Sequence, residues 1–130
     1  MIALDTSALL AIAFKEPERE VFAHAIRSNR CLIGAANVLE CHMVLRERQG
    51  ETGVKQLDDF LTRAQVATIG FDNVLLPIAR LAFDRYGKGR HPAGLNFGDC
   101  MSYAIAKAKD VPLLFKGNDF HLTDIRPALP

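Results

Sequence analysis

The chain has 130 residues, of which 49% are hydrophobic and 24% charged, and its formal net charge is +1. This length and apolar content predict a single globular domain over residues 1–130, with enough apolar material for one core. A net charge this small does not indicate a nucleic-acid-binding protein, so any such binding depends on local clusters of Lys and Arg. The three cysteines have no His or Cys at zinc-ligand spacing, which argues against a disulfide framework and a structural zinc site.

The chain shows no targeting or membrane-spanning segment. No basic stretch precedes the first apolar run, as it would in a secretory signal. The longest uninterrupted apolar run, Ala8–Phe14, is too short to cross a bilayer. We therefore expect a soluble cytoplasmic protein.

Short apolar runs alternate with helical patterns along the chain. Strands are predicted at residues 1–4, 31–33, 66–69 and 112–115. Helices are predicted at residues 8–14, 17–26, 37–50, 53–63, 71–86 and 100–109, with a Gly- and Pro-rich loop at 87–94. Because the strands are apolar throughout and are separated by helices, we expect parallel βαβ units with both faces of the sheet covered. The sequence predicts a three-layer α/β/α sandwich with a central parallel β-sheet.

Acidic residues stand near the ends of these predicted elements. Asp5 directly follows the first strand and Asp119 follows the fourth, while Glu40 lies in the first turn of the helix after the second strand. Such positions meet at the rim of a parallel sheet where ligands bind. Asp99 lies in the first turn of a helix that follows a long loop, so topology alone does not place it there.

Carboxylates crowded together repel one another and raise each other's pKa values unless a cation occupies the site. Oxygen ligands favour Mg²⁺, and Mn²⁺ can substitute for it. A metal held between carboxylates and a phosphodiester activates water and stabilises the leaving oxygen, so the expected reaction is hydrolysis of a phosphodiester.

Each acid also has a structural alternative, in which it caps a helix or stabilises a turn. The corresponding groups are Asp5 with Thr6 and Ser7, Glu40 with Asn37, Asp99 with Asn96, and Asp119 with Gly117 and Asn118. The functional interpretation therefore depends on the joint placement of the four acids.

Four features in a fixed order resemble the PIN-domain family, and specifically the VapC-like ribonuclease toxins of bacterial toxin–antitoxin pairs. They are the start Met1–Leu9, Glu40 in an early helix, Leu95–Cys100 at the opening of a late helix, and Leu113–Phe120 after the last strand. The resemblance implies an α/β/α fold and a Mg²⁺- or Mn²⁺-dependent endoribonuclease. It also implies inhibition by a cognate antitoxin that covers the active site, and assembly as a homodimer or a toxin–antitoxin hetero-oligomer.

The resemblance also implies roles for individual residues. Asp5 and Asp99 would be the principal metal ligands, Glu40 would complete the acidic cluster, and Asp119 would assist through the metal or its waters. Together these four are the predicted catalytic and metal-binding residues.

The resemblance adds four supporting residues, namely Thr6, Ser7, Asn96 and Asn118. Thr6 or Ser7 would orient the first carboxylate by a hydrogen bond. Relatives often carry an acid just before the final Asp-Phe, where this chain has Asn118, whose amide can still bind a water or a phosphate oxygen.

RNA would be held by basic groups outside the acidic cluster. We expect Arg85, Lys88 and Arg90 in or beside the Gly-rich loop, with His91 nearby, and Lys116 beside the fourth acid to contact phosphates without reading sequence. The alternative is that this loop is only a solvated connection.

Two aromatic residues on the first two helices, Phe14 and Phe22, suggest a groove for an antitoxin helix or a dimer contact. Core packing is the alternative explanation for both.

Two other classes of function remain open: a different protein class with an Asp after its first strand, and a non-catalytic module. A haloacid-dehalogenase-like phosphatase needs a second Asp two residues after Asp5, where this chain has Ser7, and a phosphoaspartate receiver would not need Glu40. A non-catalytic RNA-binding module of the same fold would predict loss of one or more acids, and all four are present.

Overall fold

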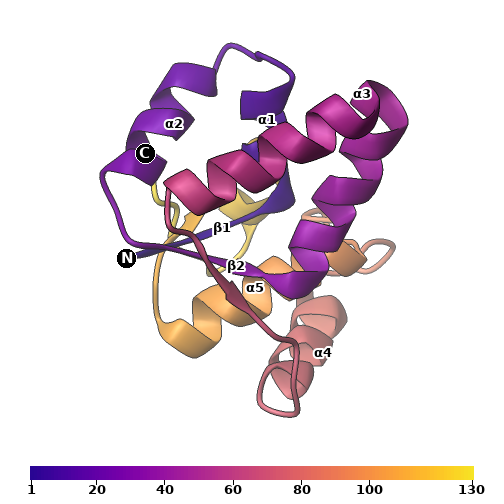
Figure 1. Cartoon of the computed structure of the whole chain (residues 1–130). Helices are drawn as coiled ribbons and strands as arrows, with labels where there is room; N and C mark the ends of the chain where they lie inside the picture. The colour runs from indigo at the N-terminus through magenta and orange to yellow at the C-terminus, as the bar shows by residue number, and fades with distance from the viewer.

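The computed structural model describes residues 1–130 and contains four strands, five α-helices and one short 3₁₀ helix (Figure 1). The strands are β1 (Ile2–Leu4), β2 (Cys31–Gly34), β3 (Ala67–Ile69) and β4 (Leu113–Leu114). The helices are α1 (Thr6–Ala13), α2 (Arg19–Arg27), α3 (Ala35–Arg63), α4 (Leu75–Tyr86), α5 (Phe97–Lys109) and the 3₁₀ helix η1 (Asp119–Leu122). None of the helices is both long and apolar enough to span a membrane.

The strands form one parallel sheet in the order β3-β2-β1-β4. In the centre, Ala3 of β1 pairs with Leu32 of β2 on one side and Leu113 of β4 on the other. The chain extends the sheet from β1 through β2 to β3 and then returns to the opposite side of β1. The strand order therefore switches between β1 and β4, and their carboxyl ends border the crevice where such sheets bind ligands.

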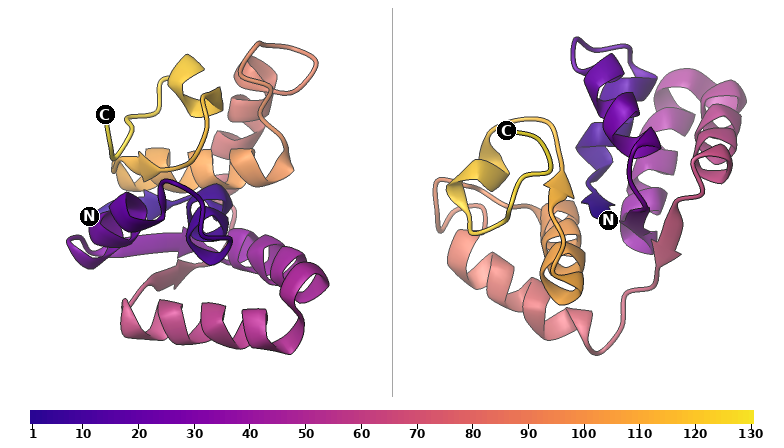
Figure 2. Two further views of the ribbon diagram at one scale, coloured as in Figure 1. Left: turned by 90° about the horizontal axis from the view of Figure 1, so that it is seen from above. Right: turned by 90° about the vertical axis from the view of Figure 1, so that its left-hand side faces the viewer.

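Helices cover the two faces of the sheet, as the right-hand view of Figure 2 shows. Successive strand residues point to opposite faces, so Ile2 and Leu4 pack in the core beneath α1, α2 and α3. Ala3 and Leu32 instead pack in the core beneath α4 and α5. The prediction of a three-layer α/β/α sandwich is confirmed.

Helix α3 is interrupted at Gly50, whose φ of 67° and ψ of −153° lie outside the helical region. A left-handed φ is accessible to Gly at little steric cost, and the two halves of the helix run in different directions (Figure 1). The prediction of two helical segments that part at Gly50 is therefore correct. The first segment begins at Ala35, two residues before the predicted start.

Strand β3 differs from the expectation that both faces of every strand are covered. Ala67 and Thr68 are exposed, and Ile69 is only half-buried. This strand lies at the edge of the sheet and pairs with β2 alone. The expectation is wrong for β3, because the helices do not extend fully over this edge strand and leave its side chains partly exposed to solvent.

Candidate active site

Asp5 follows β1 and is the N-cap of α1. The residue is only 4% exposed. One oxygen, Oδ2, accepts hydrogen bonds from the backbone N–H and the hydroxyl of Ser7, at 3.0 and 2.6 Å. The other oxygen, Oδ1, accepts a 2.5 Å bond from the hydroxyl of Ser102 on α5. The capping interpretation is thus confirmed, and bonds from two helices hold this carboxylate in one orientation.

Glu40 lies on α3 and faces the first turn of α5. A Cβ atom placed on Gly98 would lie 2.5 Å from Oε2 and 2.6 Å from Oε1 of Glu40, so the carboxylate lies directly against the glycine. The capping alternative for Glu40 is wrong. Helix α3 begins at Ala35 after the N-cap Gly34, with no side-chain cap bond, so Asn37 already lies inside the helix.

Asp99 forms a capping box with Asn96 at the start of α5. The Asn96 side chain accepts a 2.9 Å bond from the Asp99 backbone N–H, and Asp99 Oδ2 accepts a 3.0 Å bond from the Asn96 backbone N–H. Burial, and then the carboxylates of Asp5, Asp119 and Glu40, raise the pKa of Asp99 to about 6, against the opposing bond from Asn96. The capping role is confirmed, and Asp99 also lies within the electrostatic influence of the other three acids.

Asp119 is the first residue of η1, and both it and Asn118 are exposed. Asn118 makes no side-chain cap bond. The loop before them is tied to the first acid, because the backbone N–H of Lys116 donates a 3.0 Å bond to the hydroxyl of Ser7. Ser7 therefore connects the first turn of α1 to the loop that follows β4.

None of these four carboxylates, which we call the acidic cluster, forms an ion pair with a basic side chain. Hydrogen bonds and helix starts, and not basic side chains, therefore stabilise those of Asp5 and Asp99. No three His, Cys, Asp or Glu side chains close around a single point as the ligands of one ion would. The cluster is thus an open group of carboxylates and not a closed metal cage.

Three residues of this site were not assigned their roles from the sequence: Ser102, Gly98 and Asn37. Ser102 is buried on α5 three residues after Asp99, so the two share a helix face. That spacing could have identified it. The buried amide of Asn37 donates to Thr6 at 3.3 Å and to the carbonyl of Gly98 at 3.1 Å. No sequence signal gives these contacts, because they depend on the packing of α1, α3 and α5.

The basic residues predicted to hold RNA occupy different environments. Arg85, Lys88 and Arg90 are exposed and form no ion pair, and the Arg90 guanidinium stacks 5.6 Å from the centre of the Phe83 ring. Lys116 instead forms ion pairs with Glu16 and, at 3.5 Å, with Glu18. Its charge is already balanced by the loop between α1 and α2.

The backbone of the loop between α4 and α5 is held in place by contacts at its base. His91 packs edge-on against Tyr86, with ring centres 5.1 Å apart, and its Nδ1 accepts a 3.0 Å bond from the backbone N–H of Ala93. Gly87 and Leu95 form an isolated bridge across the base of the loop. The loop therefore presents its basic side chains from a defined backbone.

The two aromatic residues expected to border a partner groove pack inside the protein. Phe22 is buried in the core beneath α1, α2 and α3. Phe14 is half-buried and lies beneath the guanidinium of Arg48, 4.2 Å from the ring centre. Core packing therefore accounts for both residues, although Phe22 also lines a cavity beside α2; a groove for a partner formed by these and neighbouring apolar residues stays a prediction.

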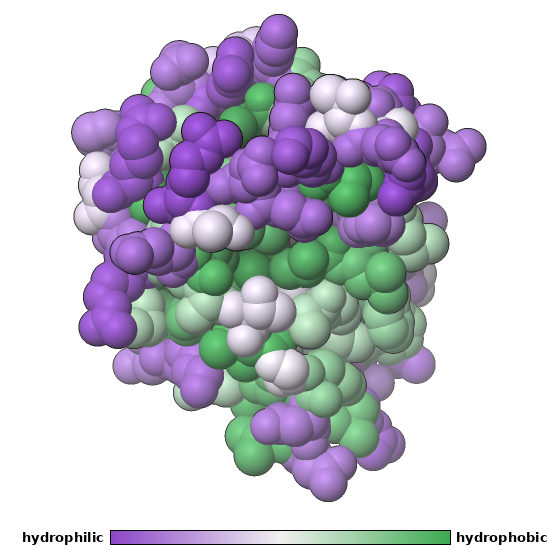
Figure 3. Space-filling model, viewed as in Figure 1, coloured by the Kyte–Doolittle hydropathy of each residue, from purple (hydrophilic) through white to green (hydrophobic).

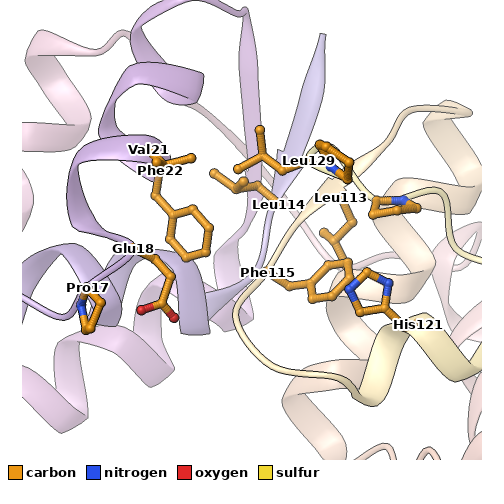
Figure 4. A pocket seen from close by; sticks show the side chains of 11 residues that line it. Pro17, Glu18, Val21, Phe22, Leu113, Leu114, Phe115, His121 and Leu129 are labelled. Atoms are coloured by element: carbon orange, nitrogen blue, oxygen red, sulfur yellow. The ribbon is translucent and has the colours of Figure 1, made fainter.

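A cavity of about 460 Å³ lies between α2 and the C-terminal segment, next to β4. Figure 4 shows Val21 and Phe22 on one side of it and Phe115, His121 and Leu129 on the other. No member of the acidic cluster lines this cavity. The candidate active site is therefore the open rim at the carboxyl ends of β1 and β4, and not this cavity.

Comparison with known proteins places the chain in a family. The family model described as "PIN domain" matches residues 2–125. A ribonuclease VapC of Mycolicibacterium smegmatis is 48% identical over 125 residues, covering 95% of this chain and 97% of the relative. Ribonuclease VapC30 of Mycobacterium tuberculosis is 46% identical over 131 residues, covering 99% and 100% of the two chains.

A solved structure has the same fold. The crystal structure of Mycobacterium tuberculosis VapC20, described as a Sarcin-Ricin loop cleaving toxin, superposes with a TM-score of 0.75 over 98% of this chain and 100% of that chain, at 17% sequence identity. Together with the matching family model and the relatives that span the whole chain, this shows that the protein belongs to the PIN-domain family, among the VapC ribonucleases.

Proposed function

We propose that this protein is an endoribonuclease that acts as the toxin of a toxin–antitoxin pair and requires Mg²⁺. The observation that carries the proposal is the acidic cluster itself. Three carboxylates act on Asp99 and help to raise its pKa to about 6, while no basic side chain of the protein pairs with any of the four. A divalent cation would relieve this repulsion. The ribonuclease names of the whole-length relatives support the same reaction.

The donor atoms fit Mg²⁺ or Mn²⁺. All four side chains offer carboxylate oxygens, which these hard cations prefer. Mg²⁺ usually binds one or two protein carboxylates and keeps several waters that also meet substrate phosphates. An open cluster suits this mode better than a closed cage does. Asp5 and Asp99 would hold the ion, with Glu40 and Asp119 acting on its waters.

A bound ion would activate a water and stabilise the leaving oxygen of the phosphodiester. The protein's own groups prepare the site for it. Ser7 and Ser102 hold both oxygens of Asp5 by hydrogen bonds, so the carboxylate loses little freedom when a cation binds. Asp99 must be ionised to act as a ligand, so metal binding should weaken as the pH falls below its pKa of about 6.

RNA would be positioned by basic residues in the last turn of α4 and in the loop between α4 and α5. Arg85, Lys88 and Arg90 are free of ion pairs and can contact phosphates without reading base sequence. Lys116 is a weaker candidate than these three, because Glu16 and Glu18 already neutralise its ammonium group.

The proposed partners are RNA, a cognate antitoxin that inhibits the enzyme, and a second copy of the chain. An apolar surface supports the last of these. Phe71, Leu76, Phe83 and Phe97 are all exposed and line a hollow of about 420 Å³ whose only charged residue is Arg80. Figure 3 shows a continuous apolar area below the polar α3, over the region of β3 and α4. Two copies joined there would bury apolar surface on both sides.

The experiment that tests this function is RNA cleavage by the purified protein. With Mg²⁺ or Mn²⁺, it should cut RNA, and EDTA should stop the reaction. Asp5→Asn keeps the size of the side chain and its cap acceptor but removes the charge, so it should lower the cleavage rate at least about 100-fold while the protein remains folded. Undiminished cleavage in EDTA or by this variant would refute the proposal. RNA binding without any cleavage would indicate the non-catalytic alternative.

A further inference from the structure

Asn37 joins the starts of three helices through one buried amide group. It lies in the first turn of α3 and is 0% exposed. Its Nδ2 donates to the carbonyl oxygen of Gly98 at 3.1 Å and to the hydroxyl oxygen of Thr6 at 3.3 Å. The Thr6 hydroxyl donates in return to the carbonyl oxygen of Asn37 at 3.3 Å. Helices α1, α3 and α5 are therefore linked at their N-terminal ends.

These three helix starts carry three members of the acidic cluster. Asp5 directly precedes Thr6, and Asp99 directly follows Gly98. Glu40 lies about one helical turn after Asn37 and rests its carboxylate against Gly98. Asn37 makes no hydrogen bond to any of the three carboxylates. It binds Thr6, the residue next to Asp5, and Gly98, the residue next to Asp99, and it lies on the same helix as Glu40.

The same side chain contains an unsatisfied group. Asn37 Oδ1 is buried and has no hydrogen-bond partner, and a Cβ atom on Gly34 would lie only 2.7 Å from it. A buried acceptor without a partner lowers stability. Leucine in its place would remove this unsatisfied acceptor, but it would also remove the two hydrogen bonds that the Asn37 amide donates. Residues that weaken the fold in this way tend to occur at functional sites.

We propose that Asn37 is a positioning residue of the active site, which sets the spacing of Asp5, Glu40 and Asp99 by binding Thr6 and Gly98. The inference rests on the proposed function, because this spacing matters to activity only if the three carboxylates act on a shared cation. Asn37 itself contacts neither the substrate nor the cation.

Two variants test the inference with Mn²⁺ as the probe. Asn37→Leu removes both donor contacts together with the unsatisfied acceptor, and Thr6→Val removes the hydroxyl partner while keeping the side-chain shape. Mn²⁺ affinity is measured by electron paramagnetic resonance, and kcat and KM for RNA are measured separately. We expect about 10- to 100-fold weaker Mn²⁺ binding and a similarly lower kcat. KM should change little, because the RNA-binding loop is untouched.

If both side chains act through one network, their effects on Mn²⁺ affinity should not add in the double variant. Tyr103→Phe is the matched control, because it removes a 2.7 Å bond between Tyr103 on α5 and Asp124 without touching the acidic cluster. It should lower the melting temperature and leave Mn²⁺ affinity unchanged. If Asn37→Leu does not fold, Thr6→Val carries the test alone.

Wild-type Mn²⁺ affinity and kcat in the folded variants would overturn the inference while leaving the proposed function intact. The inference would also be overturned if Tyr103→Phe weakened Mn²⁺ binding as much as the two variants do at an equal drop in melting temperature. A wild-type protein that neither binds Mn²⁺ nor cleaves RNA would instead overturn the proposed function, and the inference with it.

Discussion

Gly98, at the start of α5, lies directly against the carboxylate of Glu40 on α3, where a Cβ atom would come within 2.6 Å of both carboxylate oxygens. Gly98→Ala should therefore push the Glu40 carboxylate out of the acidic cluster. Alanine favours a helix by about 1 kcal/mol over glycine, and the flexible end of Glu40 can move aside. We expect the free energy of unfolding to change by less than about 1 kcal/mol while RNA cleavage falls at least about 10-fold.

Gly70→Ala is the control for this variant, because a Cβ atom on Gly70 meets nothing within 4 Å. Urea unfolding and initial cleavage rates of both variants separate stability from activity. Full activity in a folded Gly98→Ala protein would show that the position of Glu40 does not matter to the reaction.

The stability of the metal-free protein should depend on the ionisation of Asp99. Burial and the neighbouring carboxylates raise its pKa to about 6, above the value of about 3.9 in an unfolded chain. Because the folded state binds this proton more tightly, the stability from this group is complete below about pH 4 and is lost as the pH rises through about 6. The loss at pH 7.5 amounts to at most about 2 to 3 kcal/mol.

Urea unfolding in EDTA between pH 4.5 and 7.5 measures this effect. Asp99→Asn keeps the capping acceptor and removes the charge, so the variant should gain stability relative to wild type at pH 7.5 but not at pH 4.5. Mn²⁺ should stabilise wild type more than the variant. If the free energies of unfolding of the two proteins changed with pH in parallel, ionisation of Asp99 would not be what lowers the stability of the folded state.

The stability contributed by the bond between Tyr103 on α5 and Asp124 should depend on pH in the opposite direction. Burial opposes ionisation of Asp124, but hydrogen bonds from Tyr103 and Lys107 outweigh it and lower the pKa of this carboxyl. The stability it contributes is present above the unfolded pKa of about 3.9 and is lost as the pH falls through the lower folded value. Tyr103→Phe should reduce stability at pH 7 and make the loss in acid shallower. A variant as stable as wild type at pH 7 would show that this bond contributes nothing.

The basic loop should contribute to RNA affinity through charge alone. In the inactive Asp5→Asn background, Lys88→Ala and Arg90→Ala should each weaken binding to RNAs of different sequence by a similar factor. Each should also reduce the slope of log K against log salt by about 1 if it contacts one phosphate. Fluorescence anisotropy at several salt concentrations measures both quantities. Lys109→Ala, at the far end of α5, is the control, and an equal effect of all three changes would argue against a specific contact surface.

The sequence predicted the sheet and the positions of the acids better than the contacts between them. Apolar strands separated by helices imply the parallel sandwich, so the places of Asp5 and Asp119 after their strands follow from topology. Helix starts were less accurate. Asn37 resembled an N-cap, but Gly34 occupies that position and the asparagine is buried one turn later.

The bonds that orient the site could not be predicted from local patterns. Ser102 reaches Asp5 across 97 positions in the sequence, and its partner depends on how α5 packs against β1. The ion pairs of Lys116 depend in the same way on where the loop between α1 and α2 passes. Such contacts belong to the tertiary structure, whereas the sequence pattern specifies elements and their faces.

We propose that Asp5 and Asp99 hold a divalent cation between the carboxyl end of β1 and the start of α5. Crystals of the wild-type protein soaked in Mn²⁺ test it most directly, since the anomalous signal locates the ion without reference to activity. We predict an anomalous peak within about 2.5 Å of a carboxylate oxygen of each residue, and its loss in Asp99→Asn crystals. An active enzyme whose Mn²⁺ lies away from both carboxylates would contradict the account.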